Sequence, residues 1–228
     1  MLIDAYGRVI DYLRISLTQR CNFRCQYCMP ESGVELGEHE NMLSHEEMFE
    51  FVKICIDNGI KKVRISGGEP LVRKGAEDFI AMIFAYAPHI DLAMTTNGYF
   101  LKSKAQALKN AGLKRLNISL DTLNNEKFKQ IARRDGLEQV LQGIEAAKSE
   151  GLGIKLNTVA IKGFNDDEFE ALMSFAAANN AQIRFIEYME NKHANPELKS
   201  MRAEDILSKI ATFKNFKEIT KNPQSPSR

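Results

Sequence analysis

The chain has 228 residues, and 31 lysines and arginines against 30 aspartates and glutamates leave a formal charge of +1. A hydrophobic fraction of 44% with 27% charged residues is typical of a folded globular protein and excludes a disordered or collagen-like chain. The balanced charge also argues against a nucleic-acid partner that would be held by a basic surface.

The first residues carry charges at Asp4, Arg8 and Asp11 and lack the apolar core of a signal peptide. No apolar run reaches the roughly 18 residues that a membrane helix needs. We therefore expect a cytoplasmic protein with no membrane partner. In that reducing compartment, the four cysteines are more typical of metal-binding, catalytic or core residues than of disulfides.

Apolar segments with strand character alternate along the chain with segments of helical pattern. The predicted strands span 11–18, 62–66, 91–97, 115–121, 155–161 and 182–188. The predicted helices span 44–58, 76–86, 102–110, 137–150, 166–178 and 202–213, the first with Ser44 and Glu47 as a capping box. Repeated strand–helix–strand units predict parallel strands joined by right-handed crossovers.

The predicted strands are apolar on one face only. In the second strand, Val63 and Ile65 alternate with Lys62, Arg64 and Ser66. A parallel strand covered by helices on both faces would be apolar on both. Since helices cover the apolar side, the polar side lines an interior. We therefore predict an α/β fold, a partial (βα)6 barrel with parallel strands, helices outside and a wet lumen.

The polar side of these strands is also basic. It carries Arg14, Lys62, Arg64, Lys155 and Arg184, with Arg115 as a further candidate. Unpaired charges are costly to bury, and Asp121 is the only strand acid that clearly shares their side. We therefore predict a polyanionic ligand, such as a phosphate ester, in the lumen. Strand-end charges that reach solvent would explain Arg115 or Arg184, but they explain the whole set less well.

Three of the four cysteines, Cys21, Cys25 and Cys28, follow the first predicted strand with C-x3-C-x2-C spacing. Structural zinc usually has four ligands, often from paired C-x2-C units, and the sequence has no second pair. His39 or His45 could complete a zinc site, so that alternative stays open. A [4Fe-4S] cluster held by three cysteines leaves one iron open for an external ligand, and thiolates suit such clusters.

Further polar motifs follow other predicted strands. They are Gly67-Gly68-Glu69-Pro70, Thr95-Thr96-Asn97-Gly98, Ser119-Leu120-Asp121 and Glu187-Tyr188-Met189. All lie at the carboxyl ends of parallel strands, where the active sites of barrels form. The glycine pair lacks Cβ atoms, so we expect its backbone to approach a ligand closely.

This ordered set of motifs resembles the radical S-adenosylmethionine (SAM) superfamily, in which an aromatic residue precedes the third cysteine of the C-x3-C-x2-C signature. Within it, the chain is similar to the GTP 3′,8-cyclase family of molybdenum cofactor biosynthesis. The segments that carry this similarity are Leu13–Thr18, Cys21–Pro30, Val63–Leu71, Thr95–Gly98, Leu116–Asp121 and Ile183–Met189.

The resemblance implies a role for each matching residue. A [4Fe-4S] cluster would be bound by Cys21, Cys25 and Cys28, and SAM would chelate its open iron. SAM would be contacted by Tyr27, Gly68, Ser119 and Met189. GTP would be contacted by Arg14, Lys62, Arg64, Thr95, Lys155 and Arg184, a set that overlaps the basic side of the strands. Reductive cleavage of SAM would give a 5′-deoxyadenosyl radical that takes a ribose hydrogen and leads to 3′,8-cyclo-dihydro-GTP.

The C-terminal part departs from the family's pattern. We expect residues 1–190 to form the radical SAM barrel, and residues 191–228 to form a linker and the start of an incomplete C-terminal region. Family members carry a second three-cysteine cluster farther along, but no cysteine follows Cys55 here. We therefore expect a truncated chain that binds and cleaves SAM but is impaired in cyclisation.

The resemblance also implies an electron-donor protein as a partner and is compatible with a homodimer. Two alternatives stay open. One is another radical SAM enzyme, for example one that modifies a peptide, although the basic lumen favours a triphosphate. The other is a non-catalytic module that holds zinc on the three cysteines, which the identity of the bound metal would reveal.

Overall fold

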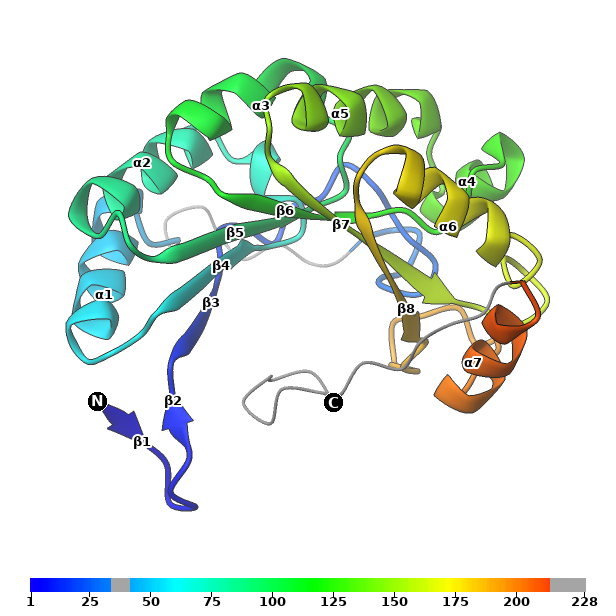
Figure 1. The fold of residues 1–228 in the computed structure, drawn as a ribbon, viewed down its shortest axis with the longest axis horizontal. Helices are drawn as coiled ribbons and strands as arrows, with labels where there is room; N and C mark the ends of the chain where they lie inside the picture. Colours follow the sequence, from blue (N-terminus) through cyan, green and yellow to red (C-terminus); the bar gives the residue numbers. More distant parts are fainter. Residues whose placement is uncertain (34–41, 214–228) are drawn as a thin grey trace.

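The computed structural model describes residues 1–33 and 42–213, and its centre is one sheet of six parallel strands. In sheet order, these are β3 (Tyr12–Ser16), β4 (Lys62–Ser66), β5 (Asp91–Thr96), β6 (Arg115–Ser119), β7 (Gly153–Ala160) and β8 (Gln182–Glu187). Figure 1 shows this sheet curving into an arch, and β3 and β8 are its two edges in the described part of the chain. The predicted partial (βα)6 barrel is confirmed.

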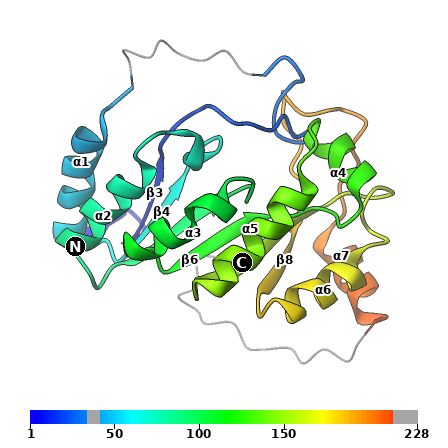
Figure 2. The ribbon, with the colours of Figure 1, turned by 90° about the horizontal axis from the view of Figure 1, so that it is seen from above.

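Helices connect successive strands and cover the convex side of the arch (Figures 1 and 2). They are α1 (His45–Asp57), α2 (Ala76–Tyr86), α3 (Leu101–Asn110), α5 (Leu137–Ser149) and α6 (Phe169–Ala178). A short 3₁₀ helix, η2 (Pro70–Val72), precedes α2, and α4 (Asn125–Ala132) precedes α5. The convex side therefore carries the core, and the concave side is left for polar groups.

The core lies between the convex face of the sheet and these helices. It is built from strand residues that are at most 1% exposed, namely Val63, Ile65, Leu92, Met94, Leu116 and Ile118. They pack in one cluster with helix residues such as Phe79, Leu108 and Ile144. Burial of each such side chain contributes on the order of 2 kcal/mol, so the alternation along the strands fixes which face meets the helices.

The capping box predicted at the start of α1 is present. The Ser44 hydroxyl accepts a hydrogen bond from the Glu47 N–H at 3.1 Å, and the Glu47 carboxylate accepts one from the Ser44 N–H at 2.7 Å. The helix ends at Asp57, and Gly59 then adopts a positive φ of 104° before β4 begins.

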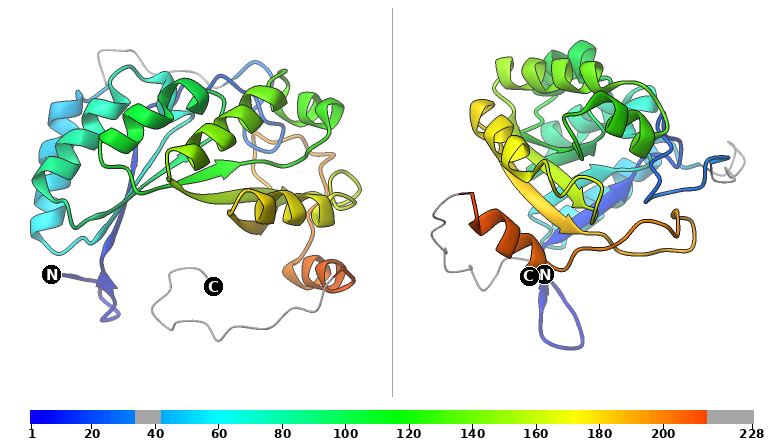
Figure 3. Two further views of the ribbon diagram at one scale, coloured as in Figure 1. Left: turned by 45° about the horizontal axis from the view of Figure 1, so that its top comes forward. Right: turned by 90° about the vertical axis from the view of Figure 1, so that its right-hand side faces the viewer.

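Apart from small shifts in the ends of other elements, the structure differs from the sequence prediction at one helix start and in elements that were not predicted. Helix α6 begins at Phe169 rather than at residue 166, because the side chains of Asn165 and Asp166 accept hydrogen bonds from loop N–H groups instead. Helix α4 was not predicted. An N-terminal hairpin of β1 (Leu2–Ile3) and β2 (Val9–Ile10) was also not predicted, and it projects away from the sheet in Figure 3.

The chain beyond β8 returns to the barrel. Helix α7 (Ala203–Ala211) packs beside β8, and Met201 and Ile206 form a small core with Ala160 and Phe169. The Pro- and Ser-containing end at 221–228 lies outside the described residues. Within the described ranges, no helix is both long enough and apolar enough to cross a bilayer.

Candidate active site

The three clustered cysteines lie in a loop that directly follows β3. Two tight backbone hydrogen bonds close its end, from the N–H groups of Cys28 and Met29 to the carbonyl oxygen of Cys25, at 2.9 and 3.1 Å. The side chains of Cys21 and Cys25 are half-buried, and that of Cys28 is exposed. None of the three forms a disulfide. The loop therefore presents three free thiols at the carboxyl end of the sheet.

The end of α4 holds this cysteine loop in place. The N–H groups of Arg24 and Gln26 donate to the carbonyl oxygens of Ala132 and Ile131, at 3.0 and 2.8 Å. In return, the Arg133 guanidinium donates to the carbonyl oxygens of two loop residues, Arg24 and Met29. Figure 2 shows the loop, in blue, beside α4. The helix that was missed from the sequence thus positions the cysteine loop.

The segment after β8 provides a second support for the loop. The Asn195 N–H donates to the carbonyl oxygen of Gln26 at 2.8 Å, and the two side-chain amides also bond to each other at 2.7 Å. The Asn191 side chain donates to the carbonyl oxygen of Tyr27 at 2.9 Å. Residues that are far apart in sequence therefore clamp the loop from both sides.

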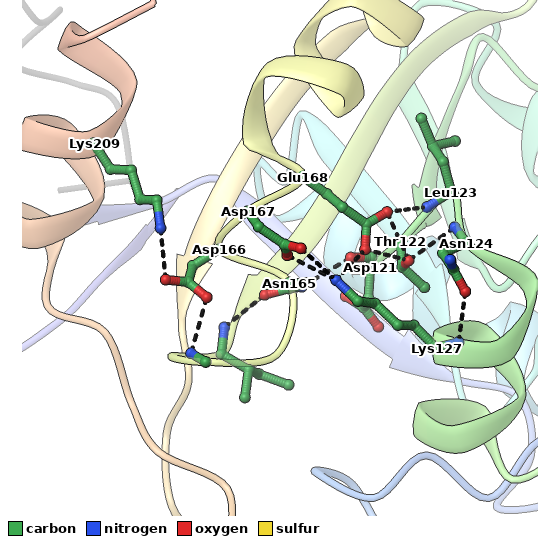
Figure 4. Close-up of polar contacts among 12 residues, drawn as sticks. Asp121, Thr122, Leu123, Asn124, Lys127, Asn165, Asp166, Asp167, Glu168 and Lys209 are labelled. Atoms are coloured by element: carbon green, nitrogen blue, oxygen red, sulfur yellow. Dashed lines mark hydrogen bonds and ion pairs between the residues drawn. The ribbon is translucent and has the colours of Figure 1, made fainter.

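A buried carboxyl connects the loop to the end of β6. The Tyr27 hydroxyl donates to Asp121 at 2.7 Å, and Asp121 also accepts from the Val159 N–H at 2.8 Å. Burial raises the pKa of Asp121 to about 6, against the lowering effect of these hydrogen bonds. Figure 4 shows Asp121 beside Asn165, whose side chain donates to the carbonyl oxygens of Asp121 and Val159.

The chemistry of the three thiols suits an iron–sulfur cluster, because soft thiolates are the usual ligands of such clusters. Burial raises the pKa of all three thiols, and in Cys25 the nearby Asp121 carboxyl and then the other two thiols raise it further. In the described residues, no three His, Cys, Asp or Glu side chains converge closely enough for one ion. Of the candidate zinc ligands, His45 packs against Phe79, and His39 lies outside the described residues.

The two glycines after β4 lie beneath the segment that leads into the cysteine loop. A Cβ atom on Gly67 would lie 2.7 Å from the Thr18 carbonyl oxygen, and one on Gly68 would overlap that of Arg20. The N–H groups of Gly68 and Glu69 donate to the same two carbonyls. Close contact with the backbone of Thr18 and Arg20 is therefore sufficient to require glycine at both positions. From the sequence, we expected close contact with a ligand to be the reason.

Glu69 is 1% exposed and ties β4 to β5. Its carboxylate accepts hydrogen bonds from the Leu71 N–H at 3.1 Å, the Thr96 hydroxyl at 2.8 Å and the Asn97 N–H at 2.7 Å. Burial nevertheless raises its pKa to about 7. The Asn97 side chain donates in turn to Asn22 at 2.7 Å, next to Cys21. Both strand ends are therefore joined to the cysteine loop.

The four residues expected to contact SAM lie along the same edge of the sheet. Gly68 follows β4, Ser119 ends β6, and Met189 follows β8, while Tyr27 lies inside the cysteine loop. Met189 is 75% exposed, and the Tyr27 hydroxyl already has Asp121 as its partner. The structure thus places all four around the carboxyl ends of the strands.

The six residues expected to contact GTP share the concave face of the sheet, here called the inner face. They are Arg14, Lys62, Arg64, Thr95, Lys155 and Arg184. Burial lowers the pKa of Arg64 and Lys155, and neighbouring cations from other strands lower both further. In the described residues, Arg14, Arg64, Lys155 and Arg184 have no carboxylate within ion-pair distance, and Lys62 lies 3.8 Å from Asp11.

The acid that shares the inner face was misassigned from the sequence. Asp91, the first residue of β5, lies opposite Lys62 in the register. Its carboxylate accepts two hydrogen bonds from the Arg115 guanidinium, at 3.1 and 2.6 Å. Asp121 lies beyond the end of β6 and bonds to Tyr27 instead. Arg115 is therefore neutralised within the protein.

The inner face also holds most of the unsatisfied polar atoms. In the described residues, five buried side-chain N or O atoms lack a hydrogen-bond partner, and four of them lie here: Tyr12 Oη, Arg64 Nε, Asn117 Oδ1 and Asn157 Oδ1. The Arg64 guanidinium lies 5.3 Å from the centre of the Tyr12 ring. The two asparagines and Tyr12 were not predicted as site residues. Their alternation with apolar neighbours could have placed them on the inner face.

Comparison with known proteins identifies the family. A family model described as the radical SAM superfamily matches residues 15–176. GTP 3′,8-cyclase of Campylobacter fetus subsp. fetus (strain 82-40) is 61% identical over 227 residues, which cover 100% of this chain and 70% of that protein. The chain belongs to the GTP 3′,8-cyclase family. A further GTP 3′,8-cyclase, from Sulfurovum sp. (strain NBC37-1), is 53% identical with the same coverage.

Solved structures of more distant proteins share the fold of this GTP 3′,8-cyclase family member. Streptococcus suis SuiB aligns with a TM-score of 0.74 at 17% identity, over 89% of this chain and 46% of SuiB. Coproporphyrinogen III oxidase from Escherichia coli, described as a radical SAM enzyme, aligns with a TM-score of 0.60 at 15% identity, over 89% of this chain and 51% of that chain. These likenesses support the fold alone.

Proposed function

We propose that this protein binds GTP on the inner face and cyclises it to 3′,8-cyclo-dihydro-GTP, the first step of molybdenum cofactor biosynthesis. One observation carries the proposal. A group of cations without carboxylate partners in the described residues faces a lumen whose carboxyl edge carries three free thiols. The high identity to GTP 3′,8-cyclases supports the same reaction.

The charges of the inner face suit a triphosphate. Arg14, Arg64, Lys155 and Arg184 repel one another when no anion is present. Burial is the main cause that lowers the pKa values of Arg64 and Lys155, and this repulsion lowers them further. A triphosphate supplies several negative charges at once, and arginine can grip phosphate oxygens bidentately. Ligand binding would therefore relieve repulsion within the protein and fix the nucleotide's position.

The carboxyl edge of the sheet suits the cofactors. Cys21, Cys25 and Cys28 would hold a [4Fe-4S] cluster, and Tyr27, Gly68, Ser119 and Met189 would contact SAM. When bound, the cluster and SAM supply the one-electron chemistry that opens a ribose C–H bond. The cations on the inner face would hold the triphosphate so that the ribose lies toward this edge, which is a positioning role.

An electron-donor protein is the partner that this chemistry requires. The exposed side chain of Cys28 supports an approach from the loop side, because the cluster would lie close to the surface there. A homodimer and the division into residues 1–190 and 191–228 remain predictions.

Anaerobic reconstitution with iron and sulfide, followed by SAM, dithionite and GTP, tests the function. Mass spectrometry would quantify 5′-deoxyadenosine and cyclised nucleotide, and Cys25→Ser serves as the cluster-free control. We expect both products from the unmodified chain and neither from the variant. 5′-Deoxyadenosine without cyclised nucleotide would show that the chain cleaves SAM but does not cyclise GTP, and would contradict the cyclase proposal. Zinc retained in place of iron would support the non-catalytic alternative.

A further inference from the structure

The polar groups of the inner face occupy different levels along the strands. Arg14, Arg64 and Arg115 lie on one rung of paired residues that also includes Ala93. This arginine rung lies two residues before the level of Asn117 on β6. Because all strands are parallel, the same direction leads to the carboxyl edge with its cysteine loop.

Two asparagine side chains lie between the arginine rung and the carboxyl edge. Asn117 pairs with Lys155 in the register, and Asn157 pairs with Ser119 on one side and with Arg184 on the other. Asn117 is fully buried, and its amide nitrogen lies 3.4 Å from the Met94 carbonyl oxygen. The side-chain oxygens of both asparagines lack any donor in the part of the chain that the structure describes.

A buried acceptor without a donor is costly, so a bound ligand that brings donors to these oxygens would be favoured. The triphosphate cannot do this, because its oxygens are acceptors at neutral pH. The donors of GTP are its ribose hydroxyls and the N–H groups of guanine. Asn157 lies at the Ser119 level, and Asn117 lies two residues before it on β6. The ribose points toward this level if the triphosphate occupies the arginine rung and SAM lies at the carboxyl edge.

We propose that Asn117 and Asn157 accept hydrogen bonds from the ribose hydroxyls of the bound nucleotide and thereby select ribonucleotides over deoxyribonucleotides. The inference rests on the proposed function, since it takes GTP as the ligand. It assigns the phosphates to the cations of the inner face and the sugar to the amide pair, whose levels also carry Lys155 and Arg184.

Binding measurements on the purified protein test this assignment without turnover. Dissociation constants are measured by calorimetry for GTP, 2′-deoxy-GTP, 3′-deoxy-GTP, inosine triphosphate and inorganic tripolyphosphate. The variants are Asn117→Leu, Asn157→Leu and Asn157→Asp. Ser66→Ala is the control, because the Ser66 hydroxyl is on the same face but already donates to the Ile15 carbonyl oxygen.

The unmodified protein should bind at least one deoxynucleotide roughly tenfold more weakly than GTP, the size of one lost hydrogen bond. Each Leu variant should lose this preference by about the same factor and bind tripolyphosphate as before. Asn157→Asp keeps an acceptor oxygen, so it should retain the preference for GTP over the deoxynucleotides even if its negative charge weakens the binding of all the ligands by the same factor. Ser66→Ala should behave as the unmodified protein.

Other outcomes overturn the inference. If the Leu variants weaken the binding of GTP and of tripolyphosphate by the same factor, the asparagines serve to position the cations and do not contact the sugar. If the variants keep the sugar preference but lose the preference for GTP over inosine triphosphate, the asparagine amides contact the guanine base and not the ribose. If a Leu variant does not fold, as judged by circular dichroism, loss of the sugar preference in Asn157→Asp would contradict the proposal. If the unmodified protein binds no GTP, the proposed function itself fails. If it binds GTP and both deoxynucleotides equally well, only the present inference fails.

Discussion

Two carboxyl groups do most to fix the carboxyl edge of the sheet at the level of single residues. Glu69 accepts three hydrogen bonds that join β4 to β5, and Asp121 joins β6 and β7 to Tyr27 in the cysteine loop. Both are buried, and burial raises the pKa of Glu69 to about 7 and that of Asp121 to about 6. Their ionisation therefore opposes folding near neutral pH.

The raised pKa of Glu69 predicts a pH dependence of stability. A folded-state pKa above the unfolded value means that the folded protein binds more protons, so the free energy of unfolding falls as pH rises from about 4.5 to 7. Glu69→Gln removes the ionisation and keeps an acceptor. We expect the variant to gain stability relative to the unmodified protein between pH 5 and pH 8, by roughly 1–3 kcal/mol.

Urea unfolding of both proteins at a series of pH values measures this difference. A gap that stays constant across the series would show that Glu69 does not titrate in that range.

Gly68 gives a second prediction at the residue scale. A methyl group there would overlap the Arg20 carbonyl oxygen, and both groups are backbone that cannot move aside freely. Gly68→Ala should lower the free energy of unfolding by about 2–3 kcal/mol in the absence of SAM. In Gly153→Ala the new Cβ would lie 3.2 Å from the Arg115 side chain, so a smaller loss is expected from this control. If denaturant titrations give Gly68→Ala and the unmodified protein the same free energy of unfolding, the glycine is not required for backbone packing, and ligand contact would be its remaining role.

At the level of secondary-structure elements, the cysteine loop depends on parts of the chain that lie far away in sequence. Helix α4 and the segment around Asn191 and Asn195 supply most of its partners. Arg133 adopts a positive φ of 51° at the end of α4, from which its side chain reaches two carbonyl oxygens of the loop. The loop is thus held by protein contacts that do not involve a metal.

Arg133→Ala should therefore weaken the loop by about 2 kcal/mol, because two charge-assisted hydrogen bonds are lost. We expect less iron and sulfide to be retained after anaerobic reconstitution and gel filtration. The neighbouring Arg134 is exposed and makes no such contact within residues 1–33 and 42–213, so Arg134→Ala is the matched control. Equal retention in the two variants would show that α4 does not support cluster binding.

Strong hydrophobic periodicity made the strands and the long helices predictable. Strand β4 and helix α2 have the predicted bounds. The apolar residues of β4 alternate with polar ones, whereas most of α2 is a continuous apolar run, longer than a typical strand. Helix α4 has only eight residues, and it is stabilised by the packing of Phe128 and Ala132 in the core and by hydrogen bonds to the cysteine loop. The pairing of Asp91 with Arg115 depends on sheet register, which a single sequence does not reveal.

At the scale of the whole molecule, the arch separates two environments. Its convex side is a continuous apolar core under helices, and its inner face gathers cations and unsatisfied polar atoms from β3 to β8. A fold that needed only stability would neutralise these groups internally, as Asp91 does for Arg115. The remaining cations therefore indicate that the inner face is completed by an anionic ligand.

A calorimetric titration with GTP tests this claim most directly, on the unmodified protein, Arg64→Ala and Arg115→Ala. Both variants remove one positive charge from the same rung, but only Arg115 already has a carboxylate partner. We predict that Arg64→Ala weakens GTP roughly thirtyfold and leaves SAM binding to the reconstituted protein unchanged, whereas Arg115→Ala weakens GTP about threefold or less. Equal losses of GTP binding in the two variants, or a parallel loss of SAM binding in Arg64→Ala, would contradict the account.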